Sequence, residues 1–370
     1  DQDAHHMHPG FHMNLRSALR IAFALPMIDA LEELLRKIRP YETVKGSAEA
    51  AFEQAMDQVI GGLEKRGVSG AKKGFEQAVE IMKAVDYDRS RPRPRVLIVG
   101  EYLLNFHPGA NHDIEAYLER NGLEVVEARM TDVIRKTYFY QDSQVREYHL
   151  KKPLPEKAWL RTADLAFDLA HSLTDSIAVR HPLYEPACRM EDLVKKSDSI
   201  IHHTFDAGEG VLIPGEILHH AEKGCRAFVI LQPFGCLPNH VVGRGIAKRL
   251  KEMYPEAQIL PLDYDPDVSF ANIENRLQML IMNARAKAEE TAEAETAQET
   301  APAEIPETAA IAAAGLAGAA VSLADAARAG AVRTGTDMAE AMRAKAARAG
   351  AAVKGGNKNG KAKEAWEGCS

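Results

Sequence analysis

Short apolar runs alternate with helical segments through the middle of the chain, and this alternation limits the possible folds most strongly. Val96–Val99 is apolar at every position, which is typical of a parallel strand covered on both faces. A helical segment over 111–121 ends at Gly122, and Leu123–Glu127 has the composition of the next strand. Strand, helix and strand with short links predict a βαβ unit and therefore a parallel sheet.

The same alternation continues towards residue 287. Three further strands are predicted at Ser197–His203, Ala227–Leu231 and Gln258–Asp263. Helices are predicted at 214–223, 246–253 and 272–287. We therefore expect an α/β fold with a parallel, Rossmann- or flavodoxin-like sheet.

The composition divides the chain into four parts. Residues 1–13 are polar and His-rich, as in a tag or a truncated start, and are excluded from fold reasoning. Residues 14–93 are predicted to form a helical subdomain, in which Pro26 breaks or kinks the first helix. The α/β domain with the Cys236 loop spans 94–287, and 288–370 is an Ala-rich low-complexity tail, disordered or transiently helical.

Charge and cysteine content exclude several classes of protein. The formal net charge is -7, which disfavours a nucleic-acid partner. Four cysteines in 370 residues do not form a disulfide framework, so we expect reduced thiols and a cytoplasmic location. The chain has no uncharged apolar run of about 18 residues, so we expect no transmembrane helix and no membrane partner.

Cys236 lies in the loop that follows the predicted strand 227–231. Pro233 and Pro238 restrict the backbone on both sides of this thiol, and Gly235 allows unusual dihedral angles. The loop leads from a strand into a helix, the arrangement that places functional groups at the carboxyl edge of a sheet. The thiol is therefore either a metal ligand, nucleophile or redox group, or a structural cysteine.

The other cysteines do not form a Cys-x-x-Cys pair with Cys236. Cys225 opens the strand that Cys236 follows, so the two thiols should lie roughly 20 Å apart. Cys188 could approach through a loop, and Cys369 lies in the tail. One thiolate is too few for an iron–sulfur cube, which takes about four ligands, so further ligands would have to come from elsewhere.

The segment Phe205–Gly210 contains Glu209 in a Gly-bearing turn before a helix, where backbone amides could meet an anion. Glu209 is either an acid or base or, preferably, a helix cap. The segment lacks the Gly-Lys-Ser/Thr of a P-loop. His202 and His203 would point to opposite faces of an extended strand and thus form a poor metal pair, as would His219 and His220 on one helix.

Polar residues after other strands are expected at the same sheet edge as Cys236. They are Glu101, His107, Asn111 and Asp263. The Asp263–Asp267 run could bind a metal, although a structural Asp-Pro turn is the preferred interpretation. A nucleotide-dependent Rossmann enzyme is disfavoured because the Gly-x-Gly-x-x-Gly pattern is absent.

Taken in order, several of these segments resemble one family, the large activases related to 2-hydroxyacyl-CoA dehydratase activation, in their C-terminal region. The matching runs are Val96–Glu101, Phe106–Pro108 with Asn111, Gly208–Gly210, Gln232–His240, Gly243–Gly245 and Asp263–Asp265, with Arg39–Glu42 before them. The resemblance covers about residues 14–285, and the Gln232–His240 run is its most specific part.

The resemblance implies that Cys236 is one ligand of an iron–sulfur cluster of the 4Fe-4S type. Gln232, Asn239 and His240 would hydrogen-bond around this cofactor, and Glu209 would act on substrate or partner. The implied function is ATP-coupled, low-potential electron transfer in anaerobic metabolism.

The implied partners are an ATPase activator domain or subunit, a dehydratase subunit and an acyl-CoA-type substrate. The ATPase domains and further cysteines of full-length relatives are missing from this sequence, as in a C-terminal fragment or a split-gene product. The alternative is a non-catalytic interaction module that docks on an activator or dehydratase, with Cys236 structural. The incomplete ligand set favours that alternative.

Overall fold

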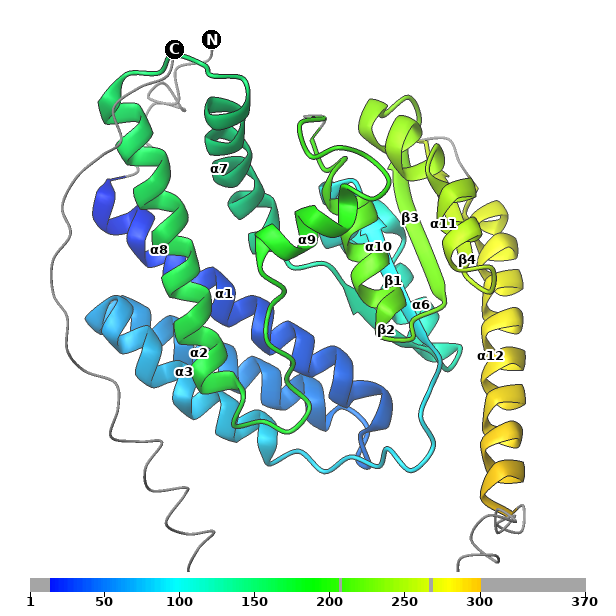
Figure 1. The fold of residues 1–370 in the computed structure, drawn as a ribbon. Helices are drawn as coiled ribbons and strands as arrows, with labels where there is room; N and C mark the ends of the chain where they lie inside the picture. The colour runs from blue at the N-terminus through cyan, green and yellow to red at the C-terminus, as the bar shows by residue number, and fades with distance from the viewer. Residues whose placement is uncertain (1–13, 206–207, 266–268, 301–370) are drawn as a thin grey trace, which may run out of the picture. The chain divides into compact units, whose positions relative to one another are not determined.

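A four-stranded parallel sheet forms the centre of the computed structural model, which describes residues 14–205, 208–265 and 269–300. Its strands are β1 (Arg95–Gly100), β2 (Glu124–Glu127), β3 (Ala227–Pro233) and β4 (Gln258–Tyr264), in the order β2-β1-β3-β4 (Figure 1). Every pairing is parallel. The predicted α/β class and parallel sheet are thus confirmed.

Helices cover both faces of the sheet, which explains why its strands are apolar at consecutive positions. On one face, Val96, Ile98 and Val229 pack with α6 (Ile114–Arg120) and α12 (Phe270–Thr300). On the other face, Leu97, Val99, Phe228 and Ile230 pack with α10 (Leu212–Glu222) and α11 (Ala247–Met253). Neighbouring residues of one strand therefore enter two different cores.

Between β1 and β2 the chain forms several short helices where the sequence predicts one longer helix. The expected helix 111–121 is replaced by α5 (Pro108–Asn111) and α6, and α4 (Tyr102–Phe106) precedes them. His112 and Asp113 separate α5 from α6 in the left-handed region, with φ of 58° and 56°. Histidine and aspartate tolerate this region better than most side chains, which allows the break.

The N-terminal part is helical, as predicted. It contains α1 (Leu15–Ile38), the short η2 (Arg39–Tyr41), α2 (Ser47–Arg66) and α3 (Val68–Lys83). Of the two predicted outcomes at Pro26, a break or a kink, the break is wrong, because α1 continues through this residue. Pro26 is buried and is followed on the same helix by the buried residues Met27, Leu31 and Leu34, so packing offsets the hydrogen bond that proline cannot donate.

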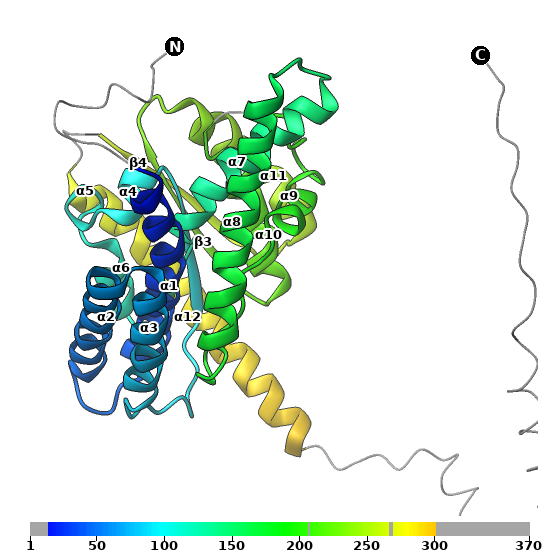
Figure 2. The ribbon, with the colours of Figure 1, turned by 90° about the vertical axis from the view of Figure 1, so that its left-hand side faces the viewer.

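Two long helices from the middle of the chain join this helical part. They are α7 (Met130–Glu147) and α8 (Leu154–Ala178), and both contact α1 (Figure 2). Ile177, Ala178 and Tyr184 are buried in the same hydrophobic core as the N-terminal helices. The described residues as far as Ala297 belong to one compact unit.

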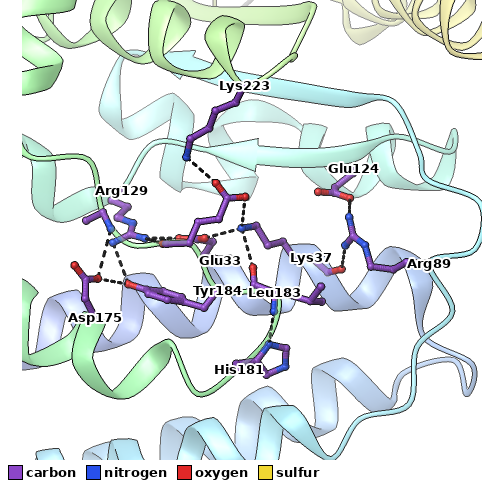
Figure 3. A network of polar contacts seen from close by, with 12 residues as sticks. Glu33, Lys37, Arg89, Glu124, Arg129, Asp175, His181, Leu183, Tyr184 and Lys223 are labelled. Carbon is purple, nitrogen blue, oxygen red and sulfur yellow. Dashed lines mark hydrogen bonds and ion pairs between the residues drawn. The ribbon is translucent and has the colours of Figure 1, made fainter. Parts of the chain in front are cut away.

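A network of buried and half-buried charges, here called the charged seam, connects α1 to the sheet and to the segment after α8 (Figure 3). Its members are Glu33, Lys37, Arg89, Glu124, Arg129 and Glu185. Arg129 donates to Glu33 at 2.5 Å and to the Glu185 carbonyl at 3.0 Å. Lys37 bridges Glu33 at 2.9 Å and Glu185 at 3.1 Å. The seam fastens elements that are distant in sequence.

The prediction of a strand at Ser197–His203 is wrong. The helix α9 (Met190–Ser197) occupies its start, and turn hydrogen bonds run from the Ile200 and Ile201 amides to the Ser197 carbonyl at 2.9 Å. The two apolar residues of the run, Ile200 and Ile201, lie in these turns and pack, partly buried, against the core between the sheet and α10, so their burial does not require a strand.

The last described helix is longer than predicted. We expected a helix over 272–287 and a tail from 288, whereas α12 runs from Phe270 to Thr300. The rest of the expected tail, 301–370, and the His-rich start, 1–13, lie outside the described residues. None of the helices that the structure describes combines the length and hydropathy needed to cross a membrane.

Candidate functional site at the carboxyl ends of β1 and β3

The Cys236 loop begins at the carboxyl end of β3, beside the carboxyl end of β1. The Glu101 amide, which follows β1, donates to the Leu231 carbonyl of β3 at 2.8 Å. In the order β2-β1-β3-β4, the connection from β1 leads to its neighbour β2 on one side, and the connection from β3 leads to its neighbour β4 on the other side of the sheet. Open α/β sheets bind their ligands at such a switch point, because the two connections diverge and leave a crevice between them.

A tight turn holds Cys236 in place. Gly235 has φ of +78°, and the Cys236 amide donates to the Pro233 carbonyl at 3.1 Å. The chain then enters η3 (Asn239–Arg244), a π-helical segment, where the His240 amide donates to the Cys236 carbonyl at 2.9 Å. Such π-helical turns are frequent at functional sites.

Three predicted site residues meet at the thiol. The Asn239 side-chain amide lies 3.2 Å from the Cys236 sulfur and also donates to the Glu209 carboxylate. The Cys236 sulfur lies 3.9 Å from Glu209 Oε1. Asn239 and Glu209 are buried, whereas Cys236 is half-buried. Residues 209, 236 and 239 therefore form a polar cluster, here called the thiol cluster.

Glu209 belongs to the site and does not cap the following helix. Val211 is the N-cap of α10, which has no side-chain cap hydrogen bond, so the preferred interpretation of Glu209 as a cap is wrong. Burial raises the pKa of Glu209, and the charge of Glu101 adds to this, while the hydrogen bond from Asn239 opposes it. A carboxylate with a raised pKa accepts a proton more readily than an ordinary carboxylate.

Gln232 and His240, both predicted to surround the cofactor, instead contact Asp263 and the loop backbone. Gln232 donates to Asp263 at 2.5 Å, and His240 Nδ1 lies 3.0 Å from the Cys236 carbonyl oxygen. Arg244 pairs with Asp263 at 2.5 Å. Burial acts to raise the pKa of Asp263, but the Gln232 hydrogen bond and the Arg244 charge lower it below its ordinary value. These contacts position the loop.

Two buried acceptor atoms at the site have no partner within the described residues. They are the side-chain oxygens of Asn239 and Gln232, and both side chains are fully buried. A buried acceptor without a donor is unfavourable by about 1–3 kcal/mol. Each of these two oxygens can therefore accept a hydrogen bond from water, a ligand or another chain.

The remaining candidates near this edge have local structural roles. The Glu101 carboxylate accepts from the Leu104 amide at 3.1 Å, and His107 accepts from the Ala110 amide at 3.2 Å. Asn111 donates to the Leu104 carbonyl at 2.7 Å. Glu101 and His107 thereby cap short helices, although the charge of Glu101 also acts on Glu209.

Sequence reasoning missed Tyr102. Its hydroxyl is buried without a partner within the described residues. Burial raises its pKa, and the charges of Glu209 and Glu101 add to this. The available signal was its position directly after Glu101, in the segment that follows β1. Arg244 lies in the Gly243–Gly245 run that contributes to the family resemblance, but its pairing with Asp263 depends on the fold.

No second cysteine joins Cys236 within the residues that the structure describes. The Cys225 thiol lies 3.5 Å from the Arg95 carbonyl oxygen, at the opposite ends of β3 and β1, as expected. Cys188 lines a separate cavity of about 70 Å³ with Asp132 and Glu216. Burial and the charge of Glu216 raise the pKa of Cys188 to about 11, which keeps this thiol protonated.

Three apolar side chains close to Cys236 in the chain are exposed. Phe234, Leu237 and Val241 are 77%, 61% and 51% exposed. We call these three residues the apolar rim. Neither the Cys188 cavity nor a second cavity of about 320 Å³ beside α1 is lined by the thiol cluster. The site therefore presents a thiol at a surface, which suits a contact with another macromolecule.

Comparison with known protein families, curated proteins and solved structures gave no match to this chain.

Proposed function

We propose that this chain is the C-terminal, ligand-donating part of an iron–sulfur protein of the activase and 2-hydroxyacyl-CoA dehydratase type. It would take part in ATP-coupled, low-potential electron transfer to a CoA-thioester system. One observation carries the proposal: the Cys236 sulfur, hydrogen-bonded by Asn239, lies inside an exposed apolar rim at the switch point of the sheet.

The described residues do not fit a complete 4Fe-4S cluster. Such a cluster takes about four ligands, and Cys236 is the one cysteine of the described site. The proposal therefore requires ligands from a partner, either an ATPase activator or a dehydratase subunit. When bound, the cluster would supply a one-electron carrier. Asn239 would hold the sulfur in position, and the apolar rim would exclude water from the contact.

A second candidate is a non-catalytic docking module with a structural Cys236. The lack of a second cysteine at the site, within the described residues, favours this candidate. The rim would then bind the activator or dehydratase through burial of Phe234 and Leu237, without a shared metal.

Anaerobic reconstitution tests the cluster proposal. The full chain is incubated with ferrous iron, sulfide and an excess of a small monothiol, which can supply the missing thiolates. We expect iron and sulfide to stay with the wild-type chain through desalting, with an electron paramagnetic resonance signal after reduction. Cys236→Ser should lose both, whereas the matched control Cys188→Ser should keep them.

Equal, near-zero iron in the wild type and Cys236→Ser would remove the cluster proposal for this chain. The docking candidate is tested separately, by titrating a purified 2-hydroxyacyl-CoA dehydratase and its activator against the chain. Phe234→Ser should weaken binding at least tenfold. Met279→Ser, which changes a residue 67% exposed on α12, is the matched control and should leave binding unchanged. Unchanged binding by Phe234→Ser would contradict the docking candidate.

A further inference from the structure

A second group of ligand-type side chains lies away from the thiol cluster, at the end of α7 and in the turns after α9. Glu147, His202 and His203 place one potential ligand atom each within 4.8 Å of one another. Among the described residues, no other set of three or more histidine, cysteine, aspartate or glutamate side chains meets this criterion. The group thus differs from the scattered surface charges of the chain.

His203 is held in an orientation that suits a metal ligand. Its Nδ1 lies 2.8 Å from Asp198 Oδ1, and its backbone amide donates to the same oxygen at 2.7 Å. The opposite ring nitrogen, Nε2, lies 2.5 Å from Glu147 Oε1. A carboxylate on one nitrogen commonly orients a histidine so that the other nitrogen binds a metal.

The two ring nitrogens of His202 also differ in their contacts. Its Nδ1 lies 2.8 Å from the Thr204 hydroxyl and accepts from the Thr204 amide at 3.3 Å. When Nδ1 instead carries the proton and donates to the Thr204 hydroxyl, Nε2 has the lone pair that a metal ligand needs, and the contact with the Thr204 amide is given up. The rings of His202 and His203 stack with centroids 4.4 Å apart. The premise that the two side chains point to opposite faces is therefore wrong, because the segment is a turn and not an extended strand.

We propose that Glu147, His202 and His203 bind a divalent first-row transition-metal ion, with Zn²⁺ as the best candidate. Two imidazoles and one carboxylate are a known three-ligand set for Zn²⁺, with a further position left for water or another ligand. Imidazole nitrogen suits Zn²⁺, whereas Mg²⁺ and Ca²⁺ prefer oxygen ligands. Asp198 acts as the positioning residue for His203.

The metal would join α7 to the segment that leads to Glu209. Tyr140, also on α7, donates from its hydroxyl to the Thr204 carbonyl, so protein contacts already connect the same two segments. The site requires no assumption about Cys236 and is independent of the proposed function. The competing explanation is a plain ion pair, in which a protonated His203 bridges Asp198 and Glu147.

Calorimetric titration of the metal-free full chain with Zn²⁺ tests the proposal. The His-rich residues 1–13 can bind metal in every variant, so the informative quantity is the difference from the wild type. His203→Asn and Glu147→Gln should each remove one site. Asp198→Asn should weaken that site by about 10–100-fold, as loss of an orienting carboxylate does.

His149→Asn is the matched control. This exposed histidine lies two residues after Glu147, and its φ of 52° is one that asparagine accommodates. It should keep the wild-type stoichiometry and affinity. Co²⁺ in place of Zn²⁺ provides a second readout, since the wild type should show visible absorption bands that Glu147→Gln lacks.

Identical Zn²⁺ stoichiometry and affinity in the wild type, His203→Asn and Glu147→Gln would overturn the proposal and leave the ion pair as the explanation. Equal loss in His149→Asn would overturn the assignment to these three ligands. Circular dichroism shows whether each variant is folded. If His203→Asn is unfolded, the folded Glu147→Gln and Asp198→Asn variants decide the outcome.

Discussion

The charged seam and the thiol cluster are both partly buried groups of polar side chains beside the same sheet, but they differ in how completely their atoms are hydrogen-bonded. In the seam, Arg129 contacts Glu33 and the Glu185 carbonyl, and it lies 5.5 Å from the Tyr184 ring centroid. In the thiol cluster and its surroundings, the side-chain oxygens of Asn239 and Gln232 have no partner within the described residues. Unpaired buried acceptors therefore separate these two regions, whereas the density of polar groups does not.

The two regions also differ in their sequence separation and position. Arg129 and Glu33 are 96 residues apart, and their pairing fastens α1 to the segment after β2. Asn239 and Cys236 are three residues apart, in a loop at the carboxyl end of β3. We therefore expect substitutions in the seam to change stability and substitutions in the thiol cluster to change binding.

The largest effect should follow removal of a seam charge. Arg129→Ala removes the guanidinium that contacts both Glu33 and the Glu185 carbonyl, although Glu33 keeps its pair with Lys37. The free energy of unfolding should therefore fall by about 3–4 kcal/mol. Urea denaturation followed by circular dichroism measures this change. Arg189→Ala, which breaks the exposed pair with Asp192, is the matched control and should be indistinguishable from the wild type. A loss below 1 kcal/mol for Arg129→Ala would mean that the seam is not structural.

The next effect tests the backbone beneath the thiol cluster. Gly100 has φ of +136°, and a Cβ there would lie 2.0 Å from the Leu231 carbonyl oxygen. Gly100→Ala should therefore cost about 2–4 kcal/mol by separating β1 from β3. Gly61→Ala, where a Cβ meets nothing within 4 Å in α2, should instead stabilise by about 0.5–1 kcal/mol. Equal effects of the two substitutions in urea denaturation would contradict the close approach.

The third effect is a pH dependence beside the seam. Burial and the charge of Glu216 raise the pKa of Asp132 to about 7, from an ordinary value of 3.8. Between these values the folded chain binds more protons than the unfolded chain, so stability falls as the pH rises from about 4 to about 7. Asp132→Asn should reduce this fall by more than about 1 kcal/mol. Urea denaturation at the two ends of this range measures it.

The exposed Asp192→Asn should keep the wild-type pH dependence of stability. If Asp132→Asn also retains the full fall with pH, a different group must be responsible for it.

The smallest effect should come from the candidate site itself. Cys236 is half-buried, so Cys236→Ala should change the free energy of unfolding by about 0.5 kcal/mol or less. Cys225 is 1% exposed, and Cys225→Ala should cost about 1–2 kcal/mol through the cavity it leaves. Urea denaturation of both variants compares them. A larger cost at Cys236 than at Cys225 would support a structural role for Cys236 and weaken the proposed function.

Local patterns predicted the sheet well and failed where one pattern fits two structures. The apolar run at Val96–Val99 can be satisfied only by burial on both faces, and the structure buries it so. The run at Ser197–His203 is also short but has only Ile200 and Ile201 as apolar residues; its first residue ends α9 and the rest forms turns. Periodicity does not separate a short buried strand from the end of a helix.

The sequence by itself determined the parallel sheet and the place of Cys236 after β3, because both depend on residues that are neighbours in the chain. The tertiary structure decided which side chains meet: Glu209 with Asn239, Arg129 with Glu33, and Glu147 with His203. These pairs are 30, 96 and 56 residues apart. Their contacts depend on how helices pack on the sheet, and local propensity carries no information about that packing.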